Sequence, residues 1–314
     1  MKPAFLKISL VLLFFCMLLQ PETVFLGARS GLLLWFETVL PTLLPFILIS
    51  NLLIHTNAFS YLTRLFGPII RQFFGTSEEG SFAVLTGFLC GYPMGAKTTA
   101  DLIRSGHITQ AEGTYLLSFC NNTSIGFIMN YIFFNILQRK DLAVPGLFIL
   151  LLSPVLTSIF FRMFYYRKYH LRNFQSPNSQ ARAPRSCSIK FDLLDTCIMD
   201  SFETITNIGG YIILFSILLA LLQESSILPP CVKLFLPALE MTNGILLLTK
   251  MFPSSDFLFP AVCALTSFGG ICAAAQTNCM IRGSGLRIVP YLIEKLITAL
   301  VTSLLCLLYL HHIL

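Results

Sequence analysis

The stretch "GYPMGAK", residues 91–97, places two glycines, a proline and a lysine inside an otherwise apolar part of the chain. The apolar limb before it, residues 82–90, is about half as long as a helix that crosses a bilayer. Gly91 and Pro93 break this limb, because glycine permits a turn and proline lacks the amide hydrogen. A second helix is predicted from Ala96 to Arg104. The segment is therefore expected to form a re-entrant hairpin whose tip faces a cavity.

The composition of the whole chain indicates an integral membrane protein. Of 314 residues, 55% are hydrophobic and 11% charged, with a mean hydropathy of +0.76, whereas a soluble domain is about 25% charged. Apolar runs that we expect to be long enough to cross a bilayer core recur at 5–19, 32–54, 142–164, 205–222 and 288–310. The predicted fold class is an all-α polytopic membrane protein, with the lipid bilayer as its surroundings.

Several functional classes find no support in the residue pattern. The ten cysteines lack the paired short spacings of metal sites, and the five histidines are isolated except for His311 and His312. We therefore expect no metal, no cofactor and no enzymatic activity. The basic residues are explained by membrane topology, so no nucleic-acid partner is expected. The pattern leaves open whether copies of the chain form a homo-oligomer.

Charge predicts the orientation of the spans. No acidic residue occurs between Asp141 and Asp192, a region rich in Lys and Arg, and loops of this kind stay in the cytoplasm. The linker 166–197 is therefore predicted to be cytoplasmic, as are Lys2, Lys7 and the loop with Arg64 and Arg71. By the same count, Arg282 and Arg287 fall on the opposite side.

Three landmarks recur in the same order on both sides of the linker, which indicates an internal duplication. "WFETVLPTLLPFIL" (35–48) resembles "SFETITNIGGYIIL" (201–214), "RLFGPIIRQFFG" (64–75) resembles "KLFLPALEMTNG" (233–244), and "GYPMGAKTTADLIR" (91–104) resembles "GGICAAAQTNCMIR" (269–282). By the charge count, the first helix of one copy crosses the membrane in the opposite direction to the first helix of the other copy. Inverted repeats of this kind meet at a solute site near the bilayer midplane. The predicted units are 1–30 (first span), 31–165 (first repeat), 166–197 (linker) and 198–314 (second repeat).

A second interruption, "CNNTSIG" at 120–126, follows a helix that Thr109 and Glu112 are expected to cap; Thr76 and Glu79 predict a similar cap before the hairpin. Hydrogen-bonding side chains at mid-membrane are costly unless they face a ligand, water or one another. Lys97 contacts solute, snorkels to the membrane interface, or pairs with a carboxylate such as Glu37 or Glu203. Glu37 and Glu203 are themselves either interfacial or in the cavity. Glu240 is a further polar candidate. The candidate substrate-binding residues are Gly91, Tyr92, Pro93, Gly95, Lys97, Asn121, Asn122, Thr123, Glu37, Glu203, Asn207, Gly269, Gly270, Gln276, Thr277 and Asn278.

The stretches at 91–128 and 267–286 resemble the sporulation integral membrane proteins of endospore-forming bacteria that carry the nucleoside-recognition, or gate, domain. The resemblance extends over about residues 30 to 310, and these proteins are similar to concentrative nucleoside transporters. It implies a transporter of a small anion: dipicolinic acid, passing from the mother cell toward the forespore across its outer membrane. Lys97 and the two expected helix N-termini suit the carboxylates of such a dianion.

Two alternatives remain open at this point. The chain could be a nucleoside-type transporter, or a sporulation membrane assembly protein that transports nothing. Packing of helices alone requires small residues and does not require Lys97, Asn121, Asn122, Gln276 and Asn278 together.

Overall fold

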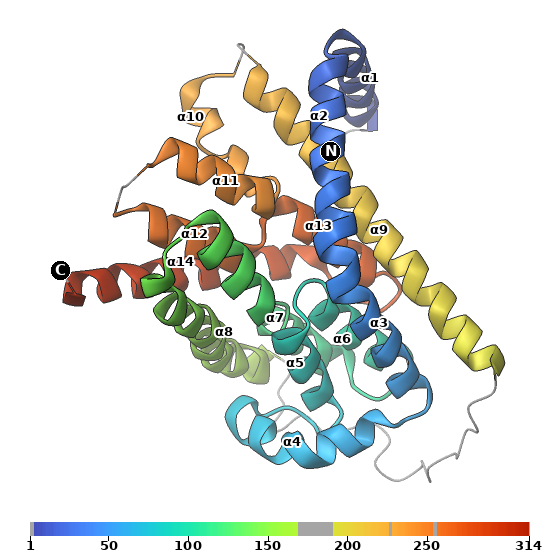
Figure 1. Cartoon of the computed structure of the whole chain (residues 1–314). Helices are drawn as coiled ribbons and strands as arrows, with labels where there is room; N and C mark the ends of the chain where they lie inside the picture. The colour runs from blue at the N-terminus through green and yellow to red at the C-terminus, as the bar shows by residue number, and fades with distance from the viewer. Residues whose placement is uncertain (1–2, 169–190, 226–227, 254–255, 314) are drawn as a thin grey trace.

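The structure, a computed structural model, describes residues 3–168, 191–225, 228–253 and 256–313; Lys2 and most of the predicted linker lie outside these ranges. The regular structure of the described residues is entirely helical (Figure 1). The first half contains α1 (Pro3–Leu19), α2 (Pro21–Leu34), η1 (Trp35–Val39), α3 (Leu40–His55), α4 (Phe59–Phe74), α5 (Gly80–Leu89), α6 (Met94–Arg104), α7 (Gln110–Phe119), η2 (Phe127–Ile136) and α8 (Lys140–Lys168). The second half contains α9 (Phe191–Glu224), α10 (Pro230–Lys233), η3 (Leu236–Ala238), α11 (Met241–Met251), α12 (Leu258–Phe268), α13 (Gly270–Met280) and α14 (Ile288–Ile313).

Five helical segments of the described chain are long and apolar enough to cross a membrane, which confirms the predicted all-α polytopic class. They are Pro21–His55, Lys140–Lys168, Phe191–Glu224, Leu258–Met280 and Ile288–His312. Four of the five contain an apolar run predicted from the sequence. The remaining predicted run, 5–19, is covered by the shorter helix α1.

The first long segment of each repeat packs against the other in the opposite direction. α2, the π-helix η1 and α3 form one continuous segment, and α9 lies beside it (Figure 1). A Cβ on Gly27 would lie 3.0 Å from the Ile217 backbone, and one on Gly31 would lie 2.9 Å from the Ile213 backbone. Gly27 thus meets Ile217, and Gly31, one turn later, meets Ile213, which comes one turn earlier on α9. The two segments are therefore antiparallel, as the inverted repeat predicts.

The predicted hairpin of the first repeat is present. α5 and α6 pack against each other, and residues 90–93 form the turn between them. The hairpin lies close to the second predicted interruption, since a Cβ on Gly87 would lie 1.7 Å from the Cys120 carbonyl oxygen. That interruption separates α7 from η2, so the first repeat continues as one broken span followed by α8.

One of the two predicted helix caps forms. The Thr109 side chain accepts a hydrogen bond from the Glu112 backbone N–H at 3.1 Å, at the start of α7. The cap predicted at Thr76 does not form, because α5 begins at Gly80 and lacks a side-chain cap. The Glu112 carboxylate instead accepts a hydrogen bond from the Ser77 backbone N–H at 2.6 Å, which ties this turn to α7.

The second repeat differs from the sequence prediction in where its hairpin turns. Gly269 was expected to be a hairpin tip, but α12 and α13 follow each other within one apolar span with a one-residue break. The preceding segment turns back instead, at residues 238–241 between η3 and α11. Glu240 stabilises this turn, since its carboxylate accepts hydrogen bonds from the backbone N–H groups of Thr242 (2.9 Å) and Asn243 (2.7 Å).

The structure also corrects the predicted side of Arg282 and Arg287. The Arg104 guanidinium, at the end of α6, donates to the carbonyl oxygens of Met280 and Arg282. The loop between α13 and α14 therefore lies at the same end of the molecule as the base of the first hairpin. The prediction was wrong because α12–α13 crosses the membrane once, whereas a hairpin would have returned to the side it left. The cytoplasmic location of this end stays a prediction.

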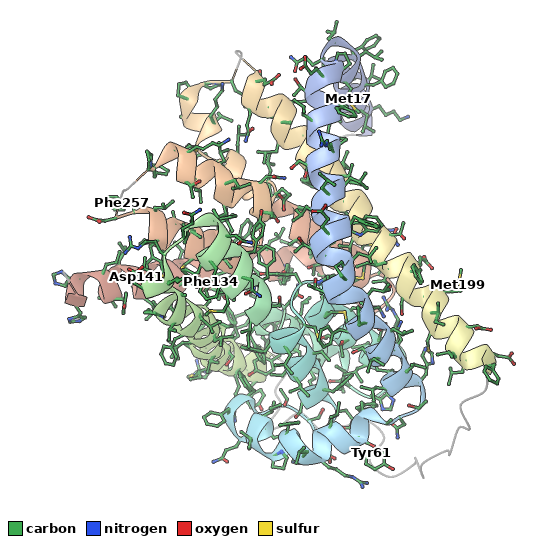
Figure 2. All side chains as sticks on the ribbon, in the orientation of Figure 1. Met17, Tyr61, Phe134, Asp141, Met199 and Phe257 are labelled. Atoms are coloured by element: carbon green, nitrogen blue, oxygen red, sulfur yellow. The ribbon has the colours of Figure 1, made fainter. Side chains whose placement is uncertain are left out.

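Large apolar side chains cover much of the outside of the bundle, as lipid contact requires. Tyr61, Phe134, Met199 and Phe257 are all more than 40% exposed, and Tyr61, Met199 and Phe257 lie at the outline of the molecule on three different sides (Figure 2). The loop that was expected around Arg64 is instead the amphipathic helix α4, whose buried side is narrow and whose other faces carry exposed apolar and basic residues. A helix of this composition is typical of the membrane–water interface.

We expect Gly31→Ala to destabilise the protein by about 1–3 kcal/mol, because the added methyl group overlaps the Ile213 backbone in the α2–α9 contact. Gly210→Ala on α9 is the matched control, since its Cβ would meet no atom within 4 Å. The measurement is the fraction of detergent-solubilised protein that survives a heat series, assayed by gel filtration. Equal losses for the two variants would contradict the close contact.

Candidate functional site

The broken segments of the two repeats meet inside the bundle. The Tyr92 hydroxyl, in the first hairpin turn, donates to the Ser267 carbonyl oxygen at 2.9 Å, near the break between α12 and α13. Gly269 has φ +83°, and a Cβ there would lie 2.8 Å from the Tyr92 ring. Gly91 has φ +88°, and a Cβ there would lie 2.7 Å from the Ser124 backbone nitrogen. Glycine is therefore required at both positions by conformation and by space.

A cavity of about 530 Å³ lies beside this junction. Its size is within the usual range for small-molecule sites. Both repeats contribute to its wall: Tyr92, Thr123 and Tyr131 come from the first and Glu240, Gly269 and Gln276 from the second. The wall combines aromatic rings with hydroxyl, amide and carboxylate groups, and Glu240 is the charged residue of the described lining. Gly91, Tyr92, Thr123, Gly269 and Gln276 are the predicted residues that line it.

Asn121 joins three helices behind the cavity wall. Its amide nitrogen donates to the Thr277 hydroxyl at 2.9 Å and to the Tyr291 hydroxyl at 3.0 Å, and its oxygen accepts from the Ala96 backbone N–H at 3.3 Å. Asn121 and Thr277 are fully buried. Thus α6, α13 and α14 are linked through one amide, and these two predicted residues hold the junction together without lining the cavity.

Lys97 has a carboxylate partner, but it is neither Glu37 nor Glu203. Its ammonium donates at 2.7 Å to the Asp101 carboxylate, one helical turn away on α6, and at 2.7 Å to Asn51 on α3. Asn51 in turn donates to the Ser201 hydroxyl on α9 at 3.1 Å. Lys97 therefore connects the first hairpin to the long antiparallel pair, and it does not line the cavity.

The remaining predicted residues divide between the junction and the outside. A Cβ on Gly95 would lie 2.3 Å from the Cys120 carbonyl oxygen, and one on Gly270 would lie 3.0 Å from the Ala238 carbonyl oxygen, so both glycines allow close backbone contact. Pro93 precedes α6 directly. Four predicted residues are exposed and line neither this cavity nor the second one described below; they are Glu37, Glu203, Asn207 and Asn278.

Sequence reasoning missed Lys295, which lies on α14 and is 1% exposed. Its ammonium donates to the Asn122 side-chain oxygen at 3.2 Å and lies 5.0 Å from the centroid of the Tyr92 ring. Asn122, a predicted residue, also donates to the Phe119 carbonyl oxygen at 2.7 Å. The signal was present in the sequence, since Lys295 interrupts the apolar run 288–310 and an ionisable residue within a membrane span is a functional candidate.

A second cavity, of about 690 Å³, opens between α2, α9 and α11. Lys233 and Lys250 lie on its wall, and none of the predicted binding residues does. Neither cavity is a metal site by composition: no group of three His, Cys, Asp or Glu side chains able to hold a metal ion occurs in the described part of the chain.

These features define a class of protein: a polytopic α-helical membrane protein in which a re-entrant hairpin and a broken span from each half of the chain lie beside a shared cavity. Comparisons with known proteins show what the chain is similar to. Residues 36–168 match the family described as "Gate: Nucleoside recognition". The chain is also 27% identical over 308 residues to sporulation integral membrane protein YlbJ of Bacillus subtilis (strain 168), with 88% of this chain and 75% of that protein covered. No solved structure matches.

Both findings confirm the family resemblance predicted from the motifs at 91–97 and 120–122. The matched Gate segment contains the first hairpin and the first broken span, which supply Tyr92, Asn121, Asn122 and Thr123. The second repeat, which supplies Glu240, Gln276 and Lys295, lies outside that segment. The chain is thus a multi-pass membrane protein that is similar to a sporulation membrane protein and, over residues 36–168, to the Gate family.

We expect Asn121→Leu to lower stability by about 2–4 kcal/mol, because it leaves the Thr277 and Tyr291 hydroxyls and the Ala96 N–H without their buried partner. Asn130→Leu is the control, since Asn130 is exposed on the cavity wall. Thermal unfolding of the two purified variants in the same detergent measures the difference. A loss for Asn121→Leu no greater than for Asn130→Leu would contradict the linking role of this amide.

Proposed function

We propose that this protein carries a small polar solute across the bilayer by alternating access between its two repeats. The observation that supports the proposal is the contact of Tyr92 with Ser267 and Gly269 beside a cavity lined by both repeats. Interrupted backbone within the membrane is tolerated where it is buried in protein or lines a wet cavity. A relative shift of the repeats would open the cavity first to one side and then to the other.

The lining favours a flat solute with polar substituents. Tyr92, Phe127 and Tyr131 offer ring faces, and the amides of Asn130 and Gln276 offer hydrogen bonds. Dipicolinate, a planar aromatic dianion, has this shape, and the sporulation relative supports a role at the stage when spores accumulate such a solute. We therefore propose that dipicolinate is the solute and that the protein acts in the outer forespore membrane, with the basic linker in the mother-cell cytoplasm.

A neutral nucleoside is the second candidate, and one feature of the cavity favours it. Glu240 is 4% exposed and lines the cavity, where a carboxylate repels an anion but accepts hydrogen bonds from sugar hydroxyls. The family description, nucleoside recognition, points the same way. The two candidates differ in charge, so they can be separated by one uptake experiment.

A protein that only assembles other membrane components is a weaker explanation. Its hairpins would need small residues for close packing, as at Gly87 and Gly95. It would not need a cavity with hydroxyl, carboxylate and amide side chains of both repeats on its wall, such as those of Thr123, Glu240 and Gln276.

The direct test is uptake of labelled dipicolinate and labelled uridine into vesicles that contain the purified full-length protein, with empty vesicles as the baseline. Saturable uptake of dipicolinate that unlabelled dipicolinate competes and uridine does not would support the first candidate. The reverse pattern would support the second. Uptake of both solutes equal to that of empty vesicles, with the protein correctly folded and inserted, would reject the carrier proposal in favour of assembly.

We expect Gly91→Ala to reduce uptake by at least about tenfold, because the methyl group would press against Ser124 and displace the hairpin turn from the break. Gly106→Ala is the matched control. Gly106 also has a positive φ, +72°, but its Cβ would meet no atom within 4 Å. Similar uptake by both variants would show that close approach at the turn is not needed for transport.

A further inference from the structure

Lys295 is a buried ammonium without a carboxylate beside it. It is 1% exposed, and no Asp or Glu oxygen of the described residues lies within 4.0 Å of its nitrogen. Its partners are one amide oxygen, of Asn122, and the face of the Tyr92 ring. Neither partner carries a negative charge, so this contact set compensates only part of the large cost of burying the ammonium.

The other buried lysine shows what full compensation looks like in the same protein. Lys97 is 8% exposed and pairs with the Asp101 carboxylate at 2.7 Å as well as with Asn51. The two lysines therefore differ in their partners. Lys97 has a carboxylate of the protein beside it, and Lys295 has none among the described residues.

The neighbouring carboxylates do not supply that charge. Glu294, next to Lys295 in sequence, is hydrogen-bonded by the Tyr165 hydroxyl, on the side of α14 that faces α8. Glu240 caps the start of α11 and lines the cavity. Neither forms an ion pair with Lys295 in the described structure.

Tyr92 contacts the ammonium and also lines the cavity. The Lys295 ammonium lies 5.0 Å from the centroid of the Tyr92 ring and does not itself line the cavity. The ring is held by the hydrogen bond from its hydroxyl to the Ser267 carbonyl oxygen. If that bond opens and the ring turns aside, the ammonium faces the cavity directly.

We propose that Lys295 binds a carboxylate group of the solute and that the Tyr92 ring covers this ammonium until the solute arrives. This inference rests on the proposed carrier function and assigns its solute to the carboxylate class. An incoming carboxylate replaces the ring and the Asn122 oxygen as the partner of Lys295. The Glu240 carboxylate, elsewhere on the cavity wall, then faces the uncharged part of the solute.

The test is equilibrium binding of labelled dipicolinate, and of its uncharged diamide, to the purified full-length protein. Wild type is expected to bind the dianion at least about tenfold more tightly than the diamide. Lys295→Met is expected to weaken dianion binding by at least about tenfold and to leave diamide binding unchanged. Lys295→Arg, which keeps the charge, is expected to restore most of the affinity.

Two further variants separate a binding role from a structural one. Lys250→Met removes the same charge from an exposed position on the second cavity and is expected to bind the dianion as wild type does. Tyr92→Phe keeps the ring but removes its bond to Ser267, so we expect dianion binding to tighten by about threefold as the cover opens more readily. Heat survival in detergent shows that each variant is folded.

The outcomes are decisive and distinguish the two proposals. Absence of saturable dianion binding by wild type, equal binding of the diamide, or unchanged dianion binding by folded Lys295→Met would each overturn the assignment of Lys295. If Lys295→Met is unfolded, Lys295→Arg and Tyr92→Phe decide, and failure of both to behave as stated overturns it. Charge-dependent binding by a protein that transports neither dipicolinate nor uridine would reject the carrier function and leave this assignment in place.

Discussion

Backbone that is interrupted within a membrane must find its hydrogen-bond partners inside the protein, and this constraint organises the whole bundle. The partners come from the opposite repeat or from the next break. The Cys272 N–H of α13 donates to the Leu239 carbonyl oxygen in the second hairpin turn at 2.8 Å, and the Thr123 hydroxyl of the first break donates to the Thr266 carbonyl oxygen at 3.0 Å. The first repeat therefore satisfies a backbone carbonyl of the second, and within the second repeat the hairpin turn satisfies an N–H of the broken span that follows it.

The same contacts between broken segments also hold the buried polar side chains in place. Polar groups that would be costly one by one form a connected set around the cavity, with Asn121 bonded on α6, α13 and α14. Within that set, charges are paired or capped with the exception of Lys295, which has only an amide and an aromatic face. In the carrier that we propose, side chains of the second repeat, which lies outside the matched Gate segment, select the charge of the solute.

Local features of the sequence predicted where helices are interrupted. Which residues then face the cavity depends on contacts between helices that are distant in the sequence. Gly91, Pro93 and the polar run 120–124 are strong local signals, because each contradicts the apolar pattern around it, and both breaks are present. The role of Gly269 was predicted wrongly, since a glycine pair ends a helix equally well at a hairpin turn and within a span. The exposed positions of Glu37 and Glu203 depend on the rotation of long helices about their axes, which their own sequence does not determine. Lys295 gave a signal that was overlooked in the longest apolar run of the second half.

Helix α4 relates the position of the first hairpin to the membrane surface. It packs on α5 and α8 through the buried face of Phe59, Thr63 and Phe74, while Arg64 and Arg71 are exposed beside apolar neighbours. An amphipathic helix of this kind settles at the headgroup level, so it sets the depth to which α5 and α6 dip. A change in hydrocarbon thickness then displaces the hairpin relative to the long spans, which adjust by tilting. On this argument, the lipid composition of the host membrane affects how the hairpin turn at Tyr92 meets the break between α12 and α13.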